Sequence, residues 1–188
     1  MKITLEQILS WGPCRGYDTA AEIVALTDAN WPKTPMEIAQ LDIPAEDRIW
    51  VLLHPEIIPE KRLHLLACDF AEKVLPIFEA AHPKDKRPRA VLEIKRQWVD
   101  GKATNGELDA ARSAIYGTDG GEVWDASEIA PWRTGWDAAR TAVYDAGSLV
   151  ARTAVMSAAM GAAISAAREG DCGLGRLYQL EMIKRVMK

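Results

Sequence analysis

The chain has 188 residues, of which 48% are hydrophobic and 27% are charged, and this balance excludes a disordered chain. The formal net charge of −4 is too mild to indicate a nucleic-acid ligand. The N-terminal stretch is too short and too acidic for a signal peptide, and no apolar run approaches the roughly 18 residues that span a membrane. We therefore expect a soluble cytoplasmic protein.

The sequence of the first third of the chain predicts a series of short helices. Thr4, with Gln7 three residues later, has the pattern of a capping box that begins the first helix, and Gly12 ends it. Apolar residues at helical spacing predict three more short helices, over residues 15–26, 35–41 and 44–53. Alternation with a period of two residues is never sustained, so no strand is expected.

Residues 60–81 carry the strongest helical pattern and form the expected centre of the fold. The apolar face of this helix includes Leu66, Phe70, Val74 and Phe78. A helix that is apolar around most of its circumference is normally buried among its neighbours. Pro76 cannot donate a hydrogen bond to the preceding turn, so we expect a bend there, and Pro83 ends the helix.

The rest of the chain continues in helices. A helix over residues 88–99 forms a hairpin with the central helix, and Thr104 with Glu107 caps another helix over residues 106–116. An alanine-rich helix is expected over residues 136–168, with Gly147 and Gly161 as points where it bends or splits, and a terminal helix over residues 174–187. The sequence thus predicts an all-α fold: a single domain over residues 1–188, built as a helical bundle with a central buried hairpin and a long alanine-rich helix.

Metal and thiol chemistry find little support in the sequence. The three histidines, His54, His64 and His82, lie in separate contexts without the spacing of metal ligands. The three cysteines, Cys14, Cys68 and Cys172, are far apart and odd in number, so we expect free thiols, with Cys68 in the core. No metal, cofactor or catalytic residue is predicted.

Two charged clusters are candidate sites. Asp69 and Glu72 lie on the central helix, where pairing with Arg62, Lys73 or a neighbouring helix is favoured over a catalytic dyad. The basic cluster Lys84, Lys86, Arg87 and Arg89 occupies one turn, whereas nucleic-acid binders spread such charge over a face. We interpret it as a solvated turn.

The candidate binding surface is an acidic segment rich in tryptophan, residues 122–136. Its candidate contact residues are Glu122, Trp124, Asp125, Glu128, Trp132, Arg133 and Trp136. Tryptophan and arginine are enriched among interface hot spots, and the acids suit a protein partner with a basic surface. The alternative is that these rings cover the open end of a helical bundle.

Several short motifs point to a family. They are K-R-L at residues 61–63, A-C-D at 67–69, A-E at 71–72, V-L-P at 74–76, F-E at 78–79 and R-P-R at 87–89. This pattern resembles the immunity protein five-like family of all-helical bacterial immunity proteins, over residues 60–115, and the chain departs from it at residues 117–136. The resemblance implies a non-enzymatic protein that binds and neutralises a toxin in polymorphic-toxin systems.

Two other functions stay open from the sequence. One is an inhibitor carried by a phage or mobile element and directed, like an anti-CRISPR protein, against a host defence system. The other is a small helical enzyme using His64, Asp69 and Glu72, although no metal spacing or nucleophile motif accompanies them. A toxin gene immediately upstream, as opposed to a block of phage genes, would separate immunity from counter-defence.

Overall fold

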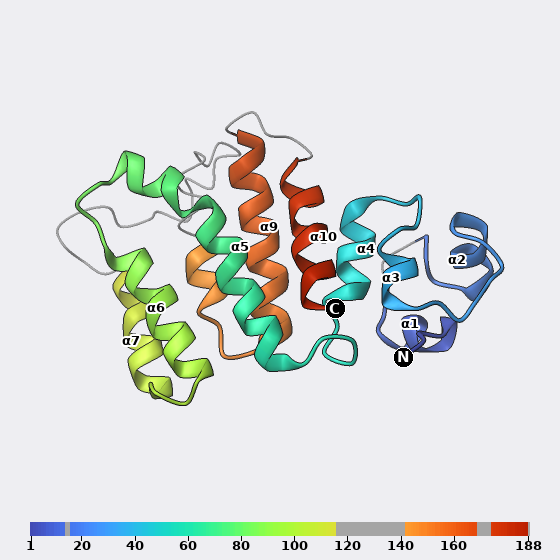
Figure 1. The fold of residues 1–188 in the computed structure, drawn as a ribbon, viewed down its shortest axis with the longest axis horizontal. Coiled ribbons are helices and arrows are strands. Elements are labelled where there is room, and N and C mark those ends of the chain that lie inside the picture. Colours follow the sequence, from blue (N-terminus) through green and yellow to red (C-terminus); the bar gives the residue numbers. More distant parts are fainter. Residues whose placement is uncertain (14–15, 116–141, 169–173, 188) are drawn as a thin grey trace. The chain divides into compact units, whose positions relative to one another are not determined.

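The computed structural model describes residues 1–13, 16–115, 142–168 and 174–187 (Figure 1). They form two compact units, one of Met1–Ile58 with Arg176–Lys188 and one of Pro59–Gly175. Regular structure in the described residues is helical, apart from one isolated bridge between Ile3 and Lys33. The predicted all-α class is therefore confirmed, while the single domain over residues 1–188 stays a prediction.

Short capped helices build the first unit. They are α1 (Leu5–Ser10), α2 (Ala20–Leu26), α3 (Pro35–Ile38) and α4 (Ala45–Leu52), with α10 (Leu174–Val186) entering the unit from Arg176. The predicted capping box of Thr4 and Gln7 is present. The predicted start of the second helix at residue 15 is wrong, because the Thr19 side chain accepts from the Glu22 backbone N–H and begins α2 at Ala20.

The second unit is organised around α5 (Glu60–Ala81), whose bounds agree with the sequence prediction. It packs against α9 (Ala151–Arg168) and α6 (Arg87–Val99), and α6 pairs with α7 (Asn105–Ile115). The four side chains predicted to be in the core are all at most 4% exposed: Leu66, Phe70, Val74 and Phe78. The helix continues through Pro76, and its last turns lean away from the direction of its first turns (Figure 1).

The alanine-rich stretch is divided at Gly147. Residues 142–146 are helical, a turn follows, and α9 begins at Ala151. Beside Gly147 lies the Arg112 side chain, whose Cγ would be 2.6 Å from a Cβ at this position. The predicted split is therefore found at Gly147, whereas Gly161, the other predicted point, lies within α9 without breaking it.

Gly161 serves close packing instead. A Cβ at this position would lie 3.0 Å from the Ala142 Cβ and 3.1 Å from its Cα, so the two helical segments touch nearly backbone to backbone. We expect Gly161→Leu to lower the free energy of unfolding by about 1–3 kcal/mol through overpacking. Urea denaturation followed by circular dichroism would measure this. Thr153→Leu, on an exposed position of the same helix, is the matched control and should be nearly neutral; equal losses in both variants would contradict the packing role.

Among the described helices, none is long and apolar enough to cross a membrane.

Candidate functional site

The predicted binding segment, residues 122–136, lies outside the described residues. Its role therefore stays a prediction for all seven candidate residues: Glu122, Trp124, Asp125, Glu128, Trp132, Arg133 and Trp136.

The tryptophans that the structure does describe are held by their own neighbours. Trp11 donates its indole N–H to Glu56 at 3.0 Å, Trp31 to Thr27 at 3.3 Å and Trp98 to Asn105 at 2.7 Å. These rings are half-buried and contribute to packing within their units. They neither support nor oppose a contact role for the three tryptophans of residues 122–136.

The basic turn, residues 84–89, joins the end of α5 to the first turn of α6. The chain leaves α5 at His82, whose φ of −129° and ψ of 66° lie outside the helical region and end the helix before Pro83. The Asp85 N–H donates to the His82 carbonyl at 3.1 Å and closes the turn. Pro88 lies in the first turn of α6, where its missing N–H costs nothing. Local sequence thus fixes where the basic side chains emerge.

Two of the four cations in this turn are neutralised. Arg89 donates from Nε and Nη2 to the two oxygens of Glu79, both at 2.7 Å. Arg87 donates from Nε to Asp85 Oδ1 at 2.9 Å and from Nη2 to Oδ2 at 2.8 Å. These bonds hold the pKa of each of the two carboxyls below its ordinary value.

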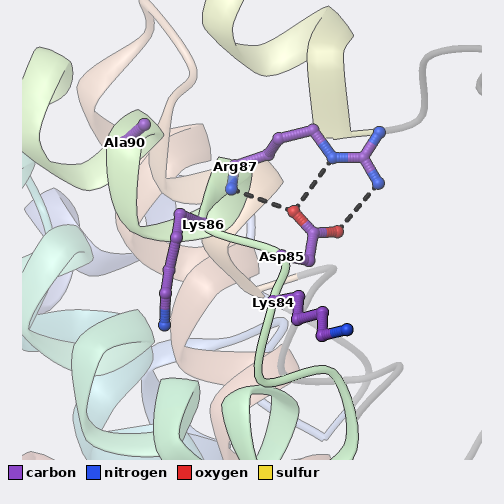
Figure 2. Close-up of a pocket in the computed structure, with 5 residues that line it drawn as sticks. All are labelled: Lys84, Asp85, Lys86, Arg87 and Ala90. Carbon is purple, nitrogen blue, oxygen red and sulfur yellow. Dashed lines mark hydrogen bonds and ion pairs between the residues drawn. The ribbon is translucent and has the colours of Figure 1, made fainter.

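The other two cations, Lys84 and Lys86, are exposed, and no ion pair engages either ammonium group within the described chain. Figure 2 shows them beside the clamped pair of Asp85 and Arg87, with Lys86 extending away from the Asp85 carboxylate. A shallow hollow of about 570 Å³ lies at this turn. It is lined by Lys84, Asp85, Lys86, Arg87 and Ala90. The turn therefore presents uncompensated positive charge next to an open surface.

The acids considered for catalysis are held in ion pairs. A single nitrogen of Arg96, Nη2, donates to Asp69 at 2.9 Å and to Glu72 at 2.6 Å. Ion pairing was predicted with Arg62, Lys73 or a neighbouring helix, and the partner shown here, Arg96, lies on the neighbouring helix α6. His64 instead packs edge to face on Trp98, with ring centroids 5.0 Å apart. The three residues proposed for an enzyme thus serve the α5–α6 contact.

Lys95 and His64 form a buried polar cluster next to this contact. The burial of Lys95 was not predicted from the sequence. Lys95 is fully buried; its Nζ donates to the Ser148 carbonyl at 2.7 Å and lies 3.8 Å from the Trp98 ring centre. Burial lowers the pKa of Lys95 to about 8. The pKa of His64 falls to about 4, first through burial and then through the charge of Lys95. Among the residues that the structure describes, none forms a hydrogen bond with the Nδ1 atom of His64. The sequence signal for this burial was the helical spacing that Lys95 shares with Val91 and Leu92.

Cys68 is a free thiol in the core, as predicted, and burial raises its pKa to about 11. We expect this thiol to resist alkylation at neutral pH in the folded chain and to react after unfolding. Iodoacetamide labelling with peptide mass mapping would show this. Replacing all three cysteines by alanine should leave partner binding intact. Rapid labelling of Cys68 in native buffer, or a disulfide in protein from a reducing cytosol, would contradict the prediction.

No group of three or more metal-ligating side chains gathers in the part of the chain that the structure describes.

Comparison with known proteins agrees with the family expected from the motifs. Residues 55–118 match the family model described as Imm-5 like putative immunity protein. The matched stretch contains α5, α6 and α7, and with them the basic turn and the Arg96 ion pairs. The chain matches no curated protein and no solved structure.

Proposed function

We propose that this chain is a non-enzymatic inhibitor of the immunity type, which binds a protein toxin in the cytoplasm and neutralises it by covering its surface. The observation that carries the proposal is the match of residues 55–118 to a family of immunity proteins. The ion pairs of Asp69 and Glu72 with Arg96 support it, because these two carboxylates would be the catalytic groups if the chain were an enzyme.

The proposed contact is the acidic segment, residues 122–136. Its carboxylates would steer a basic partner toward the site and raise the association rate. A tryptophan anchor such as Trp132 would supply much of the affinity, since a few residues dominate most interfaces. This segment is also where the chain departs from the family pattern, which suits a position that selects the partner.

Binding kinetics test this assignment. Asp125→Lys with Glu128→Lys should slow association several-fold and weaken its salt dependence, because the steering charge is reversed. Trp124→Ala or Trp132→Ala should instead raise the dissociation rate, about tenfold or more for a true hot spot. Surface plasmon resonance against the partner recovered by pull-down from the source cell provides both rates.

Asp18→Lys with Asp42→Lys is the matched control, because it changes the net charge equally at two exposed residues elsewhere. Association at the wild-type rate in the control, with slow association in the test variant, supports local steering. If all the variants are folded by circular dichroism and bind with wild-type rates, the acidic segment is not the binding site.

A further inference from the structure

We propose that the basic turn, residues 84–89, is a second docking surface, and that it takes an acidic segment of a protein partner. This inference rests on the proposed function, since the partner meant is the protein that the chain inhibits. It departs from the interpretation of the turn as merely solvated, and three features of the structure support it.

The first feature is how the structure distributes charge. Four basic side chains lie within six residues, and the two acids, Glu79 and Asp85, form ion pairs with the two arginines, although the charge of Lys86 also acts on Glu79. Lys84 and Lys86 keep their charge unpaired among the described residues, in a chain whose net charge is −4. Elsewhere along the α5–α6 contact, Lys61 pairs with Asp100 and Arg96 pairs with two acids. The positive excess is therefore concentrated at the turn.

The second feature is that the turn is rigidly built. Asp85 Oδ1 accepts from the Arg87 backbone N–H at 3.0 Å as well as from its side chain. Arg87 also donates from Nη1 to the Ala114 carbonyl of α7 at 3.1 Å, so the turn is tied to a third helix. The two lysines therefore extend from a fixed backbone. A partner would have to order little more than their side chains, which keeps the entropic cost of docking small.

The third feature is the shape and chemistry of the surface. A hollow lies beside the lysines, and the small side chain of Ala90 forms part of its lining (Figure 2). Carboxylates are suitable acceptors for the three N–H donors of each ammonium group. A nucleic acid fits less well, because two unpaired charges on one turn would neutralise only about two phosphates. An acidic protein segment is the occupant that the charge of the two lysines favours.

Fluorescence anisotropy with two labelled probes tests the inference: a polyglutamate peptide and an oligothymidylate strand, both at low salt. The wild-type chain should bind the peptide. Lys84→Glu with Lys86→Glu should weaken that binding about tenfold or more, because two attractions become repulsions. Lys61→Glu with Lys102→Glu, an equal charge change at residues whose side chains are 62% and 72% exposed, should weaken it about twofold at most.

Each other outcome overturns the inference. No peptide binding by the wild type, or equal losses in the two double variants, would mean that the turn is not a specific surface. Tighter binding of the nucleic acid, lost in the Lys84 and Lys86 variant, would replace the acidic protein by a nucleic-acid ligand. Lys84→Gln with Lys86→Gln provides a milder variant should the glutamates disturb folding. Because the probe is a peptide, this result can fail while toxin inhibition still holds, and the reverse is equally distinguishable.

Discussion

Replacing Phe70 by alanine should lower the free energy of unfolding by about 3–5 kcal/mol, the range found for large-to-small changes of buried aromatic residues. Phe70 is 1% exposed on α5, between the other core residues Leu66 and Val74. The helix packs against both α6 and α9, so the cavity would open at the centre of the second unit. Urea denaturation followed by circular dichroism measures the loss.

Met160→Ala is the matched control for this substitution. Met160 is 54% exposed on α9, so removing its side chain should change the free energy of unfolding by about 0.5 kcal/mol at most. A loss well under about 1 kcal/mol in Phe70→Ala would contradict the central position of α5.

Acidification from pH 6.5 to 4 should cost about 2 kcal/mol of stability through His64 alone. Burial and the charge of Lys95 depress the pKa of this imidazole to about 4 in the folded chain. In this interval the unfolded chain therefore binds a proton that the folded chain does not, and stability falls as the pH falls. Lys95 is charged in both states here, since its own pKa is lowered only to about 8.

The comparison with His64→Leu isolates this contribution. The substitution removes the titrating ring and its unpartnered Nδ1, so the folded chain should remain stable near pH 7. The free energy of unfolding should then depend less on pH between 6.5 and 4 than in the wild type. If both proteins lose the same stability over this interval, His64 is not buried in its neutral form.

The helical spacing of apolar residues predicted those parts of the fold that depend on one face of a single helix. The bounds of α5 and its core residues Phe70 and Phe78 were predictable, because a long apolar pattern bounded by two prolines has few alternatives. The start of α2 was not predicted, although the Thr19 and Glu22 capping box is readable in the sequence. Apolar spacing continues on the N-terminal side of this cap, so it does not mark the residue at which α2 begins.

Other features depend on residues far away in the chain. Gly147 and Gly161 look alike in sequence, yet one lies beside Arg112 at a turn and the other packs on Ala142 within a helix. The burial of Lys95 depends on the carbonyl of Ser148, 53 residues further along the chain. Helical spacing places Lys95 on the same face as Val91 and Leu92, but local pattern does not show which distant residue its side chain contacts.

The same distinction between local pattern and distant contacts applies to the two candidate surfaces, the basic turn and the acidic segment. The sequence located the basic turn but did not show which of its cations are free, because Arg89 is neutralised by Glu79 from the preceding helix. The acidic segment at residues 122–136 was identified from composition alone and remains a prediction.

The central claim is that the chain neutralises a toxin by covering its surface, and a stoichiometric titration tests it most directly. The toxin used is the partner that a pull-down from the source cell recovers, and its activity is measured as the purified chain is added. Occlusion predicts that activity falls to zero at a fixed molar ratio and returns when the complex is dissociated by denaturant and the toxin refolded. Loss of activity at far below one chain per toxin, or toxin that stays inactive after separation, would indicate an enzyme instead. Full toxin activity at every ratio would contradict immunity towards that toxin.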